Sequence, residues 1–96
     1  MIEVHKTDEF DAWLSALTDF KAVAKIVTRI ERLALGNPGD VKAVGGGVSE
    51  MRIAYGPGYR IYYKQTAKEI VLLLCGGDKA TQDKDIKRAK EIAAEL

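Results

Sequence analysis

Residues 48–75 read VSEMRIAYGPGYRIYYKQTAKEIVLLLC, and their pattern decides the fold. Apolar and polar side chains alternate through Val48–Ala54 and again through Tyr59–Gln65, which predicts two half-buried strands. The residues between them, Tyr55–Gly58, combine glycine and proline in the way that a tight turn requires. Ile70–Cys75 is apolar on both faces, which is typical of a strand deep inside a domain. We therefore expect an antiparallel meander of three strands.

A strand and two helices are expected before this meander. Met1–Lys6 alternates between apolar and polar side chains, as a short strand does. Two stretches with apolar residues at helical spacing follow it, and Thr7 and Asp19 are placed to cap them. The expected helices are Asp8–Leu17 and Phe20–Leu35, and Gly36 ends the second. Residues 37–47, which include three consecutive glycines, are expected to form a loop.

The last part of the chain is expected to form one more helix. Gly76-Gly77 is expected to end the third strand, and Thr81–Glu95 shows a modest apolar stripe at helical spacing. The stripe consists of Ile86, Ala89, Ala93 and Leu96. Because it contains few large side chains, we expect this helix to pack weakly or to be detachable. The predicted order β-α-α-β-β-β-α makes residues 1–96 a single α+β domain. Its sheet is mainly antiparallel, with an N-terminal helical hairpin and a C-terminal helix.

Composition excludes several classes of protein. The 96 residues are 47% hydrophobic and 30% charged, which is typical of one folded domain and not of a disordered tail. The longest apolar run is too short for a membrane span, and the first residues lack the apolar block of a signal peptide. One cysteine and one histidine argue against a disulfide framework and a zinc site, and favour a reducing cytoplasm. The net charge of +1 is small for a nucleic-acid binder, so a polyanion would have to be bound by local placement of cations.

Strand pleating brings charged side chains together on one face of the meander. Glu50 and Arg52 point to the same side of their strand, and Arg60, Tyr62 and Lys64 point to the same side of the next strand. A hairpin across the turn can place the two sets next to each other. The result would be an open sheet face that carries two guanidinium groups, a carboxylate and a phenol.

Two interpretations of these residues stay open. Alternating charges on a solvated antiparallel face are ordinary, and Glu50 can simply pair with Arg60 across the strands. Lys79, just after the third strand, can lie at the rim of the charged face, and the free N–H groups of Gly76-Gly77 can hold a phosphate. The alternative at this junction is a tight turn that Asp78 caps locally.

The other chemically active side chains fit structural roles better. His5, the only histidine, is expected on a solvated strand, and Cys75 in the core. Trp13 lies at helical spacing with apolar neighbours, which indicates a core residue. Asp83 and Asp85 are two positions apart on a helix, so they do not share a face and make a poor metal pair.

Four short motifs in the second half of the chain carry a resemblance to a known family. They are Ser49-Glu50-Met51-Arg52-Ile53, Tyr55-Gly56-Pro57-Gly58-Tyr59-Arg60, Leu74-Cys75-Gly76-Gly77-Asp78-Lys79, and Gln82 with Asp85-Ile86. With them the chain resembles the phage-derived Gp49-like, HigB-type addiction-module killer proteins of the RelE/ParE toxin superfamily. The N-terminal strand and the two helices match in order and size, so the resemblance covers essentially the whole chain and implies the RelE-like fold.

The resemblance implies a cytoplasmic toxin of a toxin–antitoxin module that arrests growth. Its partner would be a helix-turn-helix antitoxin. The toxin would bind operator DNA only through that antitoxin, and it would not bind a membrane. Many members of the superfamily cleave mRNA in the ribosomal A site, without a metal ion or another cofactor. In that reaction the 2′-hydroxyl attacks the adjacent phosphodiester. The attack requires a base, a stabiliser of the phosphate charge, and an acid for the leaving oxygen.

The resemblance also gives roles to residues of this chain. Arg60 would stabilise the transition state, Arg52 would hold the phosphate, and Glu50 would be the general base. Further RNA or phosphate contacts would come from Lys79, Tyr62 and Lys64. Many members have a functional tyrosine or histidine near the last helix, but Gln82–Lys87 contains neither. The acid would therefore have to be Tyr62 or Asp85.

Two other functions stay open for the same resemblance. The chain can be a non-catalytic, ParE-like inhibitor of DNA gyrase, which the missing tyrosine or histidine favours. It can also be an inert partner that acts only inside an antitoxin–operator complex. In each case we expect the apolar side of the antitoxin to cover or distort the face that carries Arg52 and Arg60.

Overall fold

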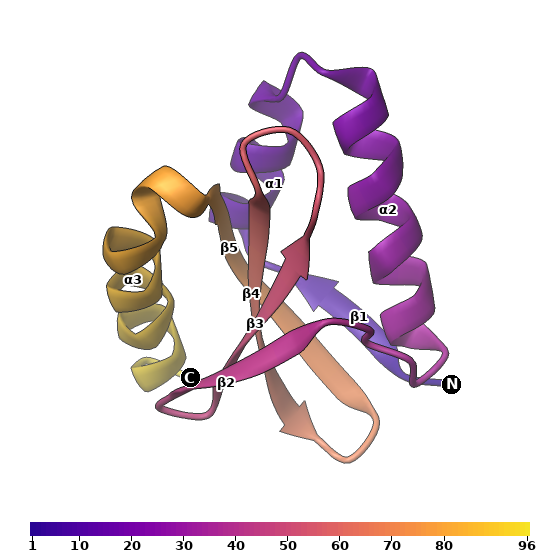
Figure 1. Cartoon of the computed structure of the whole chain (residues 1–96). Coiled ribbons are helices and arrows are strands. Elements are labelled where there is room, and N and C mark those ends of the chain that lie inside the picture. Colours follow the sequence, from indigo (N-terminus) through magenta and orange to yellow (C-terminus); the bar gives the residue numbers. More distant parts are fainter.

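The computed structural model describes residues 1–96 and contains one five-stranded sheet with helices on both sides (Figure 1). The strands are ordered β1-β5-β4-β3-β2, with β1 parallel to β5 and all other pairs antiparallel. The elements are β1 (Glu3–Lys6), α1 (Asp8–Ala16), α2 (Phe20–Ala34), β2 (Val41–Gly45), β3 (Val48–Ile53), β4 (Tyr59–Ala67), β5 (Ile70–Asp78), the 3-10 turn η1 (Lys79–Thr81) and α3 (Gln82–Ala94). The expected α+β class and the β3-β4-β5 meander are confirmed.

The predicted loop at residues 37–47 is partly wrong, because Val41–Gly45 forms the edge strand β2. This strand pairs with β3, and the chain turns between them through three glycines that all have positive φ. Residues in β2 are exposed or half-buried and give little alternation, which explains why the pattern missed the strand. The observed order therefore has one strand more than the predicted β-α-α-β-β-β-α.

The prediction that Gly76-Gly77 ends the third strand is wrong as well, since β5 continues through both residues to Asp78. Both positions require glycine, because side chains from the helices lie directly against the strand there. A Cβ atom at Gly76 would overlap the indole of Trp13 from α1, and one at Gly77 would overlap the carboxylate of Asp85 from α3. Only glycine lets side chains approach the strand this closely.

Local capping places the first two helices as predicted. The Thr7 hydroxyl accepts from the backbone N–H of Phe10, at 3.0 Å, and donates to the carbonyl oxygen of Leu74 in β5, at 2.7 Å. The carboxylate of Asp19 accepts from the N–H groups of Lys21 and Ala22 at the start of α2. These caps satisfy N–H groups that have no partner inside the helix.

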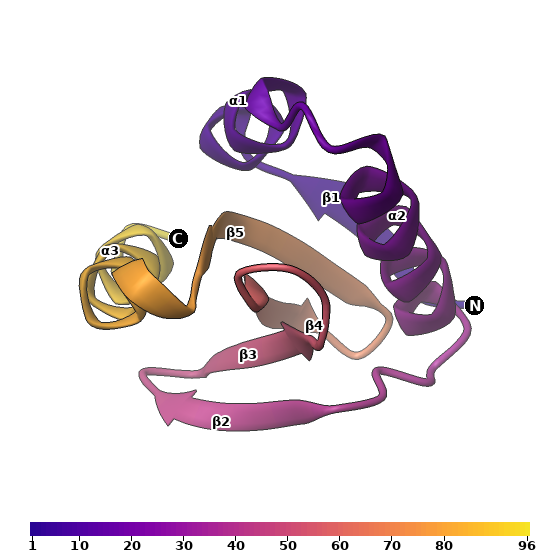
Figure 2. The ribbon, with the colours of Figure 1, turned by 45° about the horizontal axis from the view of Figure 1, so that its top comes forward.

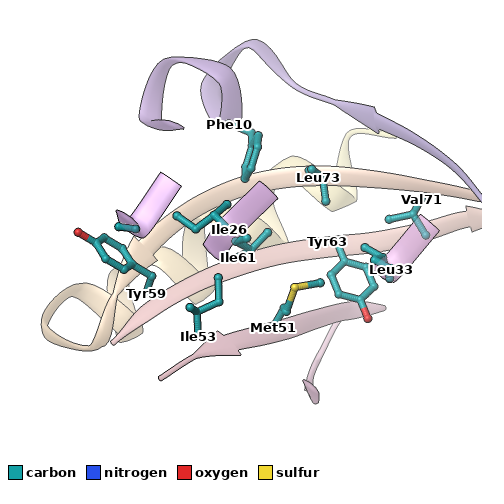
Figure 3. Packing of buried hydrophobic residues seen from close by; sticks show 11 residues of the cluster. Phe10, Ile26, Leu33, Met51, Ile53, Tyr59, Ile61, Tyr63, Val71 and Leu73 are labelled. Carbon is teal, nitrogen blue, oxygen red and sulfur yellow. The ribbon is translucent and has the colours of Figure 1, made fainter. Parts of the chain in front are cut away.

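The two faces of the sheet carry separate apolar clusters. The larger one, shown in Figure 3, lies between the sheet and helices α1 and α2. It contains Phe10, Ala22, Ile26, Leu33, Met51, Ile53, Tyr59, Ile61, Tyr63, Val71 and Leu73. The smaller cluster lies on the α3 side and contains Val48, Tyr62, Leu74, Cys75, Ala89, Ile92 and Ala93. Figure 2 shows α3 well apart from α1 and α2, with β5 between them.

Helix α3 packs through Ala89, Ile92 and Ala93, which are buried against the strands. The predicted stripe is corrected at its end, because Leu96 is 61% exposed and Ile92 takes the inner position. No helix of the structure has both the length and the apolar content needed to cross a membrane.

Candidate functional site

Five polar side chains gather on the α3 face of the sheet. Two come from β3 and two from β4, and register pairs them directly, Glu50 with Tyr62 and Arg52 with Arg60. Gln82, the first residue of α3, completes the group. We call these five residues the Glu50 cluster. The strand faces expected from the pleat are thus the observed ones.

Glu50 is the centre of the cluster. Its Oε1 accepts from Nε of Arg52 at 3.1 Å, and its Oε2 accepts from the Tyr62 hydroxyl at 3.0 Å and from Nε2 of Gln82 at 2.9 Å. Nε of Arg60 lies 4.0 Å from Oε1. The carboxylate therefore bonds to the arginine of its own strand, while the cross-strand arginine stays beyond hydrogen-bond distance.

The expectation of an open sheet face is wrong at the centre of the cluster, where Glu50 and Tyr62 have no exposed surface. Helix α3 packs over this part of the sheet, and its Gln82 is bonded to Glu50. The arginines lie nearer the solvent, with the side chain of Arg52 33% exposed and that of Arg60 13% exposed. Only the guanidinium side of the cluster is thus open to a ligand.

The environment of Glu50 keeps it ionised. Burial by itself would raise the pKa of this carboxyl, but hydrogen bonds from Gln82, Arg52 and Tyr62 outweigh burial and lower the pKa below its usual value. Burial and the neighbouring Glu50 carboxylate raise the pKa of the Tyr62 phenol, so Tyr62 stays protonated and donates. The result is a fixed negative charge between two guanidinium groups.

Arg60 is the one member of the cluster with unused hydrogen-bonding capacity at a buried atom. Its Nη1 donates to the carbonyl of Gly58 at 3.2 Å, but its buried Nε has no partner. Lys79 lies close by, since a Cβ atom at Gly58 would be 3.4 Å from both Nη1 of Arg60 and Cβ of Lys79. This Nε faces the Glu50 carboxylate at 4.0 Å, so the outer nitrogens of the guanidinium are the ones that an anion can approach from the solvent side.

The junction after β5 is the tight turn of the second interpretation. Oδ1 of Asp78 accepts from the N–H groups of Ala80 and Thr81, at 2.9 and 3.2 Å, so these N–H groups are capped by Asp78. Asp85, one turn into α3, accepts a hydrogen bond from the Thr81 hydroxyl and lies over Gly77. Since Gly77 pairs with Arg60, the Asp85 carboxylate lies next to the Glu50 cluster.

The remaining candidates lie elsewhere. Lys64 is opposite Val48 at the other end of β3 and packs against Gly47, so no contact joins it to the Glu50 cluster. His5 is exposed and bonded to Glu3 at 2.8 Å, as expected of a solvated strand histidine. Cys75 is in the core, where burial raises the pKa of its thiol to about 12.

Sequence reasoning did not select Gln82 as a site residue, although it belongs to one of the motifs. The only signal in the sequence is the position of Gln82 at the start of the last helix. This helix follows β5, which pairs with the strand of Arg60. Which side chain of a first helical turn points to the sheet depends on the turn before it. The 3-10 turn at Lys79–Thr81, capped by Asp78, sets this direction.

Two comparisons place the chain among known proteins. The model of the phage-derived Gp49-like protein family (DUF891) matches residues 12–96. The chain is also 55% identical to an uncharacterized protein of Haemophilus influenzae over 95 residues, which cover 99% of this chain and 96% of that relative. The family match spans the whole Glu50 cluster as well as helices α2 and α3. The chain therefore belongs to the Gp49-like family, the phage-derived family of HigB-type toxins.

Proposed function

We propose that this protein is the toxin of a type II toxin–antitoxin module and that it cleaves mRNA on the ribosome through a RelE-like site built around Arg60. The family supports the toxin role and an antitoxin partner. The observation that carries the cleavage is the Glu50 cluster, above all the pairing of Arg52 with Arg60 on its solvent side. A phosphodiester between Arg60, Arg52 and Lys79 would accept hydrogen bonds from the outer nitrogens of both guanidinium groups.

In the proposed reaction the 2′-hydroxyl loses its proton and its oxygen bonds to phosphorus, while the bond from phosphorus to the 5′-oxygen breaks. The 5′-oxygen takes a proton, which leaves a 2′,3′-cyclic phosphate and a 5′-hydroxyl. The pentacovalent phosphate carries extra negative charge. Guanidinium groups held at that charge stabilise it more in the transition state than in the ground state.

We assign Glu50 the role of fixing the arginines. As a general base it would have to give up one of the hydrogen bonds from Arg52, Tyr62 and Gln82, and it has no exposed surface. As an anchor it holds the Nε of Arg52 while the outer nitrogens of that guanidinium stay available. A rigid anchor of this kind lowers the cost of placing charge in the transition state.

For the proton of the 2′-hydroxyl we propose the Asp85 carboxylate as the acceptor, while a water molecule protonates the leaving 5′-oxygen. Tyr62 is buried and its hydroxyl is already donated to Glu50. Asp85 is only half-buried, and it lies over Gly77, the sheet partner of Arg60. Replacement of Asp85 by Asn should lower RNA cleavage without lowering RNA affinity. Asp83→Asn, an exposed position on the same helical turn, is the control and should leave cleavage unchanged.

The central experiment is Arg60→Ala. The variant should lose about 100-fold or more in RNA cleavage, as enzymes do when a transition-state donor is removed. After induction in growing cells it should no longer arrest growth, while it still folds and binds the antitoxin. Lys68→Ala removes an exposed cation from the turn after β4, outside every candidate site, and is the control. Primer extension on translated transcripts is the measurement.

The alternatives predict different results in the same cells. Intact messages during growth arrest would contradict the proposal, and inhibition of supercoiling by purified gyrase would then identify a ParE-like inhibitor. Expression without any growth defect would identify an inert partner of the antitoxin. A structure with the antitoxin should show its apolar side over the guanidinium groups of Arg52 and Arg60.

A further inference from the structure

A second group of cations lies on the opposite side of the sheet, outside the Glu50 cluster. It lines a cleft of about 380 Å³ between α2 and the end of β3. The lining residues are Ala24, Lys25, Thr28, Arg29, Arg32, Ile53 and Ala54. Figure 1 shows the elements that border it, helix α2 and the loop that joins β3 to β4.

The charge of the cleft follows from the pattern of α2. Lys21, Lys25, Arg29 and Arg32 recur at spacings of three and four residues, which places them along one side of a helix over roughly 16 Å. The only acid in α2 is Glu31, which lines a different, mainly apolar groove with Val27 and Ile30. The basic side of α2 therefore has no acidic residue of its own helix beside it.

Charges on the neighbouring elements do not neutralise the cleft either. Asp19 caps α2 and accepts from the Tyr55 hydroxyl at 3.0 Å. Asp40 contributes its backbone carbonyl, which accepts from Arg29 at 3.3 Å, and its side chain forms no ion pair. Two of the cations, Lys25 and Arg32, form neither a hydrogen bond nor an ion pair. Lys25 has its ammonium 5.3 Å from the centre of the Tyr55 ring.

Arg29 connects this cleft to the Glu50 cluster. Its Nη1 donates to the backbone carbonyl of Arg52 at 2.6 Å, and its Nη2 donates to that of Pro38 at 2.9 Å. The side chain of Arg52 leaves the same strand on the other face, toward Glu50. The two groups of cations are thus separated only by β3 and the turn that follows it.

We propose that this cleft binds the RNA backbone beside the cleaved phosphodiester, so that one strand of RNA contacts Lys25 and Arg32 on one side of the 54–58 turn and Arg60 on the other. The inference rests on the proposed function, since it extends the same substrate site. A basic groove with an aromatic ring next to it, here Tyr55, is the usual form of a surface for single-stranded nucleic acid. The guanidinium of Arg29 is bonded to carbonyl oxygens of the protein backbone. Lys25 and Arg32 are therefore the cations that remain free to contact phosphates.

The test measures binding apart from cleavage. A fluorescent 2′-O-methyl oligoribonucleotide of about 12 nucleotides has no nucleophilic hydroxyl and is long enough to reach both sites. Lys25→Ala/Arg32→Ala should bind it about 10-fold more weakly at low salt. The slope of log affinity against log salt should become shallower by about 1.4, because two phosphate contacts are lost. Lys68→Ala/Lys90→Ala removes the same charge from exposed positions elsewhere and should behave as wild type.

Several results would overturn the inference. They are absence of binding by the wild-type protein at low salt, wild-type affinity of the cleft variant, and an equal loss in the control variant. Loss of antitoxin binding with unchanged RNA affinity would assign the cleft to an acidic protein and would also overturn it. The proposed function fails separately. If Arg60→Ala leaves the cellular effect unchanged while the cleft variant loses RNA affinity, the RNA surface stands and the assigned cleavage site does not.

Discussion

The sheet face under α1 and α2 is filled with large apolar side chains, whereas the face under α3 has an ionised carboxylate at its centre. The first face buries Phe10, Ile26, Met51 and Ile61 completely. On the face under α3, the helix contributes two alanines and one isoleucine to the smaller apolar cluster. The same face also holds Glu50 and the side chains that donate hydrogen bonds to it. The larger apolar cluster and the polar Glu50 cluster thus lie on opposite faces of one sheet.

The comparison shows how a small domain can keep a buried charge. Taking Glu50 out of water is costly, and its three hydrogen bonds offset that cost without a large gain in stability. The net stabilisation must therefore come from the apolar face, where burial contributes roughly 25 cal/mol for each Å² removed from water. The strands β3 and β4 belong to both faces, so the core on one side holds the arginines on the other.

The largest expected effect is therefore on the apolar face. Phe10→Ala should lower the free energy of unfolding by about 4 kcal/mol, because it removes a fully buried ring from the centre of the larger cluster. Ile92→Ala on the α3 face should cost about 2 kcal/mol, since Ile92 lies at the edge of the smaller cluster. Urea titrations of both variants measure the difference. Equal costs would show that the two faces stabilise the domain alike.

The next effect concerns the charge at the centre of the α3 face. Glu50→Gln keeps the shape of the side chain but removes the negative charge that accepts from Arg52 and Tyr62, and should cost about 2 kcal/mol at neutral pH. Glu69→Gln, at an exposed position just before β5, makes the same exchange outside the cluster and should change stability little. A smaller loss in Glu50→Gln would mean that Glu50 is not a favourable anchor.

The pH dependence of the same variant gives an independent check. The pKa of Glu50 is lower in the folded chain than its usual value of 4.5, so the stability that the carboxylate contributes is complete above that value. It is lost as the pH falls through the lower, folded pKa. The difference in stability between wild type and Glu50→Gln should therefore shrink below about pH 4.5. A constant difference down to pH 2 would contradict the assigned pKa direction.

Much of the fold could be predicted because burial imposes a period on the sequence. The strands β3 and β4 alternate between an apolar face and a polar face, and the helices α1 and α2 show both a cap and an apolar stripe. The edge strand β2 has no buried face and could not be recognised in this way. The pattern at Gly76 and Gly77 predicts the end of a strand, because the sequence does not show that Trp13 and Asp85 lie against these two residues.

The composition of the candidate site could be predicted, but its burial could not. The pleat and the resemblance both select Glu50, Arg52, Arg60 and Tyr62, which register then brings together. Whether such a face is solvated depends on where the last helix docks, and a stripe poor in large side chains gives no direction for docking. The position of Gln82 over Glu50 is therefore tertiary information.

A smaller effect is expected where α1 begins. Thr7 caps this helix and also bonds to Leu74 in β5, so Thr7→Ala should cost about 1 kcal/mol. Thr18, an exposed threonine before α2, forms no side-chain hydrogen bond, and Thr18→Ala should leave stability nearly unchanged. Thermal unfolding of both variants is the measurement. A loss with Thr7→Ala as large as that with Phe10→Ala would make the cap, and not the apolar cluster, the main support of this face.

The smallest effect should come from the ion pair that joins the two sides of the molecule. Arg88 of α3 donates from Nη2 and Nε to the carboxylate of Glu9 in α1, at 2.8 and 3.1 Å, and both side chains are exposed. Arg88→Gln should lower the melting temperature slightly at low salt and not at high salt, because water and ions screen such pairs. Lys87→Gln, which removes an exposed charge from the same helix, should show no such salt dependence. If Arg88→Gln instead destabilised the protein as much as Ile92→Ala, the docking of α3 would depend on this pair and not on its buried residues, and the helix would detach as the salt concentration rises.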